Sequence, residues 1–175
     1  MKTPLVCAVC LLFIASLSPA QVLETPGGLG VGAAFEISVP VKSLADRAGT
    51  GYGGSARFEY VPYKNIGLVA TVGYLSWGDK GDAAVTSTVK AIELLAGPKF
   101  GIGSGWYGGF ELGVYQATEK FSISGVQSIE RELTEAMMGV FLGYEFSGVD
   151  LGVKYYPFDE AYTNVMVSVG YWFGL

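Results

Sequence analysis

The sequence predicts an all-β fold: a closed antiparallel up-and-down transmembrane β-barrel of about eight strands. Two observations lead to this fold. Strand-like segments alternate from Leu29 to Leu175, with mid-segment charges on one parity and bulky apolar residues on the other. No window after residue 20 has the unbroken apolar run of a membrane helix. A strand that crosses a bilayer turns apolar side chains to lipid and polar groups to the lumen, so the pattern indicates an inside-out barrel.

Residues 1–20 predict a cleaved signal peptide. Lys2 precedes an apolar run from Leu5 to Leu17, and small residues close the segment at Ala20, before Gln21. The run is shorter than the about 20 residues that a membrane-spanning helix needs, which argues against an anchor. We therefore expect export, cleavage before Gln21 and a barrel domain over residues 21–175.

Turn signals divide the alternating region into segments. Short turns are expected at Pro62–Asn65, Gly101–Gly105 and Ser147–Asp150. Between them lie longer polar stretches that we expect to be loops: Lys42–Thr50, Gly78–Ser87 and Thr118–Glu132. Short turns at one rim and longer loops at the other are typical of outer-membrane barrels. Ten strands remain an alternative to eight if a long loop contains an extra hairpin.

Charged residues in the middle of the strands share the inward parity. They are Glu36, Arg57, Glu59, Glu93, Lys99, Glu111, Glu145 and Lys154. A basic residue on the lipid face near mid-bilayer costs about 2–4 kcal/mol, so these charges are expected in the lumen. They could form an ion path, a carboxylate active site or a hydrogen-bonded plug. We favour the plug, because an eight-stranded barrel is just wide enough for its own side chains and the signs are mixed.

Aromatic residues gather toward the predicted strand ends, where amphipathic rings suit the boundary of water and lipid. The candidates for this girdle are Tyr60, Tyr74, Trp77, Trp106, Tyr144, Phe146 and Tyr155. A carbohydrate-stacking surface is the alternative. Such a platform would cluster on one loop, and the spread of these residues over many strands favours the girdle.

The residue types present exclude several functions. The chain has no His, and both cysteines, Cys7 and Cys10, lie in the expected leader. The usual nucleophile–base pairs and transition-metal sites are therefore missing, and we predict neither enzymatic activity nor a metal or other cofactor. The formal net charge is −5 and the basic residues are scattered singly, which argues against nucleic acid as a partner.

The C-terminal segment adds a resemblance to a family. Val169, Tyr171, Phe173 and Leu175 alternate to the last residue, which resembles the assembly signal of bacterial outer-membrane barrel proteins, whose last residue is usually Phe. With the leader and the strand pattern, the mature chain resembles a small OmpX-like or OmpA-like barrel. This resemblance implies a monomer in the outer membrane of a diderm bacterium, in contact with lipid and inserted by the barrel-assembly machinery.

Three functions remain open from the sequence. The first is a structural or surface-interaction role with a plugged lumen and an extracellular loop partner that the sequence does not identify. The second is a conduit for small hydrophobic molecules, as in OmpW-like barrels, for which inward Val69, Leu75 and Phe141 would be suited. The third is a soluble periplasmic calyx of the lipocalin type, in which the parity would be reversed.

Overall fold

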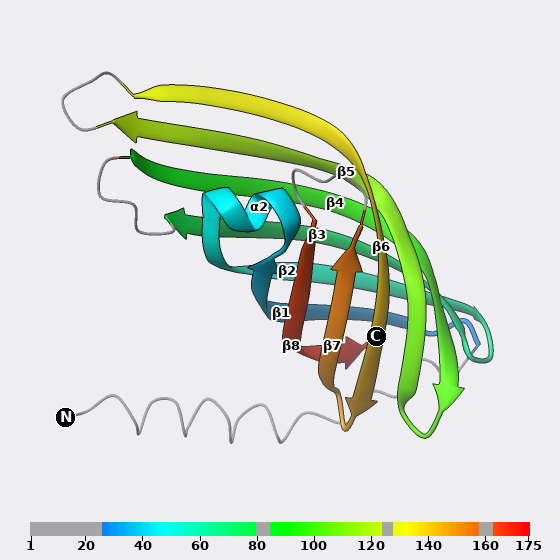
Figure 1. The fold of residues 1–175 in the computed structure, drawn as a ribbon. Helices are drawn as coiled ribbons and strands as arrows, with labels where there is room; N and C mark the ends of the chain where they lie inside the picture. The colour runs from blue at the N-terminus through cyan, green and yellow to red at the C-terminus, as the bar shows by residue number, and fades with distance from the viewer. Residues whose placement is uncertain (1–25, 80–84, 124–127, 158–162) are drawn as a thin grey trace, which may run out of the picture.

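The computed structural model describes residues 26–79, 85–123, 128–157 and 163–175. They form a closed antiparallel barrel in the order β1 to β8, with β1 paired to β8 (Figure 1). The elements are β1 (Leu29–Pro40), α2 (Lys42–Arg47), β2 (Ala48–Tyr63), β3 (Ile66–Asp79), β4 (Val85–Gly103), β5 (Trp106–Ile123), β6 (Ile129–Phe146), β7 (Val149–Tyr156) and β8 (Asn164–Gly174). The predicted fold class is confirmed, with eight strands rather than ten. The expected leader, residues 1–20, lies outside the described residues.

Exposure alternates along the strands in the inside-out sense. In β1, Phe35 is 54% exposed while its neighbour Glu36 is fully buried. Leu112 and Glu111 on β5 repeat this contrast. Bulky apolar side chains thus cover the outside of the barrel, an arrangement that lipid stabilises and water does not. The lipocalin-type alternative is wrong, because it needs Glu36, Glu93, Glu111 and Lys154 in water, and all four are buried inside.

Two-residue turns connect the strands at one end of the barrel, which we call the turn end. Ser104 and Gly105 join β4 to β5, and Ser147 and Gly148 join β6 to β7; all four have positive φ between 48° and 85°. Positive φ at both central residues defines the type I′ turn, whose twist matches that of paired strands. Lys64 and Asn65 make the third short connection, between β2 and β3.

At the opposite end, β4, β5 and β6 project beyond the rest of the barrel (Figure 1). β5 and β6 stay paired from Trp106 and Tyr144 out to Phe121 and Ile129, but the pairing of β6 with β7 stops at Val140 and Tyr155. We call this the projecting end.

The projecting strands correct two predicted loops. Most of Thr118–Glu132 is strand, since β5 runs to Ile123 and β6 starts at Ile129. Likewise, β3 continues to Asp79 and β4 starts at Val85, within the predicted loop Gly78–Ser87. Beyond the lipid, both faces of a strand can be polar. The apolar alternation therefore ends there while the backbone pairing continues.

The predicted loop Lys42–Thr50 is also wrong, because Lys42–Arg47 forms the short helix α2 and Ala48 begins β2. Leu44 on this helix is fully buried in the lumen. Six residues are too few for a helix that is stable alone, so packing of Leu44 is what stabilises it. No helix among the described residues is long and apolar enough to cross a membrane.

Candidate functional site in the barrel lumen

The lumen is filled by three layers of side chains. Nearest the turn end lies a small apolar group of Val61, Val69 and Trp172. The charged residues form the middle layer, which we call the charged layer. Toward the projecting end lies the cap layer, an apolar cluster of Leu44, Ala48, Leu75, Trp77, Val89, Ala91, Leu95, Tyr115, Ala117, Met137, Tyr156 and Met166. The charged layer therefore lies between two apolar groups.

Arg57 on β2 joins side chains from four strands. Its Nη2 lies 3.1 Å from Glu36 Oε1 on β1, and its Nη1 lies 2.5 Å from Asp150 Oδ2 on β7. Ser55 Oγ donates to the same Glu36 oxygen at 2.7 Å, and Tyr107 on β5 donates its hydroxyl hydrogen to Asp150. One guanidinium thus connects β1 and β2 to β7, across the closure of β1 on β8.

Lys99 on β4 is the centre of a second cluster. Its Nζ lies 3.0 Å from Glu59 Oε2 and 3.3 Å from Glu145 Oε2. The ammonium also lies 4.2 Å from the ring centroid of Tyr107 and 5.0 Å from that of Trp172, within cation–π range. Since Tyr107 also binds Asp150, it connects this cluster to that of Arg57.

The third cluster lies nearer the cap layer. Lys154 Nζ is 3.0 Å from Glu111 Oε1, and the Tyr156 hydroxyl donates to the same oxygen at 2.6 Å. Glu93 lies close enough to interact electrostatically with Lys154, Glu36 and Glu111. Among the described residues it forms no ion pair, and its Oε1 has no hydrogen-bond partner.

Sequence reasoning predicted eight of these charged residues, and the structure places all of them on the inward side. It missed Asp150, which we assigned to a turn although it shares the inward parity of Gly152 and Lys154 on β7. With Asp150 included, the charged layer contains six carboxylates and three basic side chains. The layer as described carries more acid than base, and each basic residue contacts at least one carboxylate.

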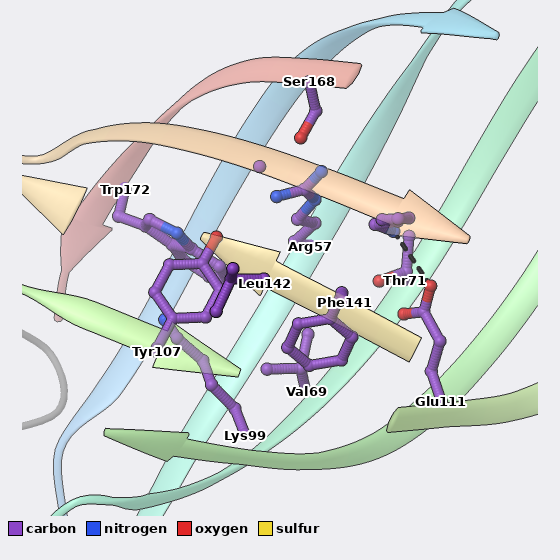
Figure 2. A pocket seen from close by; sticks show the side chains of 12 residues that line it. Arg57, Val69, Thr71, Lys99, Tyr107, Glu111, Phe141, Leu142, Ser168 and Trp172 are labelled. Carbon is purple, nitrogen blue, oxygen red and sulfur yellow. Dashed lines mark ion pairs between the residues drawn. The ribbon is translucent and has the colours of Figure 1, made fainter. Parts of the chain in front are cut away.

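Little free space remains between these side chains. A cavity lined by Arg57, Thr71, Lys99, Glu111, Ser168 and others leaves only about 20 Å³ for the centre of a water molecule, enough for about one water. Figure 2 shows side chains from several strands converging on this space, with Tyr107 and Trp172 near Lys99. The buried hydroxyls of Thr71 and Ser168 have no protein partner and suit such a water.

The predicted girdle residues do not all lie on the outside. Tyr60, Tyr74, Trp106, Phe146 and Tyr155 are between 38% and 49% exposed on the outer surface, and Tyr144 is half-buried there. Trp77 is an error of the prediction: it is only 4% exposed and points into the cap layer, where its Nε1 donates to Ser38 Oγ at 3.1 Å. Trp77 shares the inward parity of Leu75, so the alternation along the strand already indicated the lumen. The prediction was wrong because it followed the residue type, an aromatic near a strand end, rather than the parity.

Several aromatic residues of the outer surface form groups near the turn end. The ring centroids of Trp106 and Tyr144 lie 5.1 Å apart, and those of Tyr144 and Phe146 lie 5.9 Å apart. On β8, the Tyr171 and Phe173 rings are 4.8 Å apart. Leu175, at the end of the proposed assembly signal, is 77% exposed, and Val169 faces outward.

The groups available for metal binding and for substrate are few in the charged layer as described. Within the described residues, no group of three or more His, Cys, Asp or Glu side chains could hold a metal ion. The carboxylates are held by basic or hydroxyl groups or packed beside them, and the cavity admits no substrate larger than water. The arrangement brings paired charges from several strands together inside the lumen.

Comparisons with known proteins agree with this fold. No protein-family model and no curated protein matches the sequence. Among solved structures, the chain is similar to Ail, the attachment invasion locus protein of Yersinia pestis, with 20% identity over 85% of this chain and 100% of that one, at a TM-score of 0.65.

Two further structures are similar. OprG from Pseudomonas aeruginosa matches with 13% identity over 86% of this chain and 97% of that one, at a TM-score of 0.53. Neisserial surface protein A matches with 17% identity over 82% of this chain and 95% of that one, at a TM-score of 0.50. The chain therefore has the fold of the small eight-stranded outer-membrane β-barrels of the OmpX and OmpA type.

Proposed function

We propose that this chain is an integral outer-membrane protein with a structural or surface-interaction role and a lumen plugged by its own side chains. The observation that carries the proposal is the layered lumen, in which paired charges lie between two apolar groups and leave room for about one water. In a barrel whose lumen is filled in this way, other molecules bind to the outer wall or to the projecting end.

The orientation follows from the unequal ends. Outer-membrane barrels have short periplasmic turns and longer extracellular segments, so we place the turn end in the periplasm and the projecting end outside the cell. The projecting strands then display side chains such as Lys90, Lys120 and Glu132, all of them exposed. Surface contact through β4, β5 and β6 is the role that this placement favours.

The remaining parts of the proposal concern biogenesis. Export through residues 1–20, cleavage before Gln21 and recognition of Val169, Tyr171, Phe173 and Leu175 by the barrel-assembly machinery would deliver a monomer to the outer membrane. N-terminal sequencing of the membrane-bound protein should begin at Gln21. A start at Met1 would contradict the cleavage.

Cysteine labelling on intact cells tests the placement. The chain has no cysteine after residue 20, so Glu132→Cys on β6 and Ser104→Cys in a two-residue turn each introduce a single thiol into the barrel domain. A maleimide that does not cross membranes should label Glu132→Cys on whole cells and Ser104→Cys only after lysis. Labelling of both on whole cells, or the reverse order, would contradict the proposal.

The alternative function is a conduit for small hydrophobic molecules, which needs an open path through the lumen. Val69, Leu75 and Phe141 do face inward, but Val69 packs against Trp172, Leu75 packs within the cap layer, and the cavity that Val69 and Phe141 line has room for about one water. Planar-bilayer recordings of the purified barrel should show no steady conductance. Sustained channel openings would argue against the plug.

A further inference from the structure

The outer wall at the projecting end contains a polar hollow. It has a volume of about 280 Å³ and is lined by Thr88 and Lys90 on β4, Thr118 and Lys120 on β5, and Glu130 on β6. Both lysines and Glu130 are exposed.

The register places this hollow next to the apolar belt. Ile92 on β4 is 55% exposed on the outer face and pairs with Tyr74 on β3, an aromatic residue of the kind found at the lipid boundary. Lys90 is the next outward residue after Ile92, about 7 Å farther along the strand. Lys90 therefore lies at the height where lipid headgroups begin.

The two lysines form a pair across the strands. Lys90 lies opposite Thr118, and Lys120 lies opposite Thr88. This makes the lysines diagonal neighbours, with Cα atoms about 7–8 Å apart. Two flexible ammonium groups at this spacing can approach one phosphate, while the threonine hydroxyls between them can donate hydrogen bonds to it.

These lysines differ from the basic residues of the lumen. Arg57, Lys99 and Lys154 all form ion pairs with carboxylates, whereas neither Lys90 nor Lys120 forms one among the described residues. Among the described residues that line the hollow, the acid is Glu130, which lies opposite Lys120 on β6; the exposed Glu132 lies beside the hollow, opposite Thr118. The lining side chains, two lysines and one glutamate, therefore carry a net positive charge on an acidic protein.

We propose that this hollow binds the phosphate group of an outer-leaflet lipid headgroup. The inference rests on the proposed function, because it needs the projecting end to lie outside the cell. A lipid is favoured over free phosphate by the apolar wall beneath the hollow. Acyl chains packed against Ile92 and Val114 would hold a lipid phosphate beside Lys90 at a high effective concentration.

Native mass spectrometry of the folded barrel tests the site. The protein is placed in phosphatidylcholine nanodiscs that contain a bisphosphorylated lipid A, and the retained lipid A is titrated. We expect the double variant Lys90→Gln/Lys120→Gln to bind it about tenfold more weakly than the wild type, since each lysine near a charged lipid surface adds to affinity. Glu130→Gln should bind it more tightly, because it removes the one carboxylate of the hollow.

A matched control removes the same charge elsewhere at the same end. Lys42→Gln/Arg131→Gln changes two exposed residues outside the hollow and should leave lipid A binding within about twofold of the wild type. Equal loss in both double variants, or no loss in Lys90→Gln/Lys120→Gln, would overturn the proposal. Soluble inorganic pyrophosphate should displace lipid A only at concentrations far above that of lipid A. Displacement at an equal concentration would overturn the assignment of the site to a lipid.

This test is independent of orientation. Each variant is first shown to be a folded, inserted barrel by the shift in gel mobility between unboiled and boiled samples. Binding in nanodiscs then reports on the hollow whichever way the barrel faces in the cell. If labelling placed Glu132 in the periplasm, the proposed function would fail even with the hollow functional.

Discussion

The charged layer and the cap layer fill the same lumen by different means. In the charged layer, three basic side chains connect carboxylates from strands that are distant in sequence, such as Glu36 on β1 and Asp150 on β7. The cap layer is held by apolar contacts, and part of it comes from one short helix rather than from the wall. The comparison leads us to expect that the charged layer stabilises barrel closure, whereas the cap layer packs one end of the lumen.

The largest effect is expected from breaking the charged layer at Arg57. Arg57→Leu leaves Glu36 and Asp150 buried without their shared cation. Removing one partner of a buried pair costs about 3–5 kcal/mol, because the remaining charges stay desolvated. Urea titration of the folded barrel in lipid vesicles should show this loss in the free energy of unfolding.

Arg131→Leu provides the matched control for this variant. Arg131 is exposed on the projecting part of β6 and lies outside the charged layer, so the same chemical change should leave the unfolding midpoint nearly unaltered. Equal stability of Arg57→Leu and wild type would show that the charged layer does not hold the barrel together.

A smaller and local effect is expected in the cap layer. Leu44→Ala removes the fully buried side chain of α2 and should cost about 2–5 kcal/mol in the docking of this helix. Trypsin cleavage after Lys42 should then be at least about tenfold faster, because the detached helix is open to the protease. Asp46→Ala, on the exposed side of the same helix, is the control.

If the layers differ as described, Leu44→Ala should change proteolysis more than it changes the unfolding of the barrel. A fall in the unfolding midpoint as large as that of Arg57→Leu would instead make α2 an integral part of the barrel core. In either case the turn end should be unaffected, since its apolar group of Val61, Val69 and Trp172 does not include α2.

The fold could be predicted because the bilayer imposes one rule on every strand inside it. Alternation from Leu29 onward predicted about eight strands, with ten left open, and the inward side of Glu36 and Lys154, because a charge on the lipid face is costly. That rule stops at the lipid boundary. Strands beyond it, such as the outer part of β5 up to Ile123, carry polar residues on both faces and resemble loops in sequence.

The contacts within the lumen could not be predicted in the same way. Parity places Arg57 and Asp150 inside the barrel. Which carboxylate pairs with which basic residue depends on the register with which β1 closes on β8 and on the position of each side chain along the barrel axis. Trp77 was assigned to the girdle because a tryptophan suits a lipid boundary, and Leu44 was missed because a leucine in a polar stretch gives no periodic signal.

The smallest effect, and the only one expected to be neutral or favourable, is that of Glu93→Gln. Glu93 is 2% exposed and forms no ion pair with the described residues, so its charge adds to the excess of acid in the charged layer. Glutamine keeps the shape and removes the charge, and the free energy of unfolding should stay within about 1 kcal/mol of the wild type or rise. Glu111→Gln, by contrast, weakens the pair with Lys154 and should destabilise the barrel. If Glu93→Gln destabilised the barrel more than Glu111→Gln, the ionised Glu93 would be a stabilising member of the charged network. The excess of carboxylates would then not lower the stability of the folded barrel.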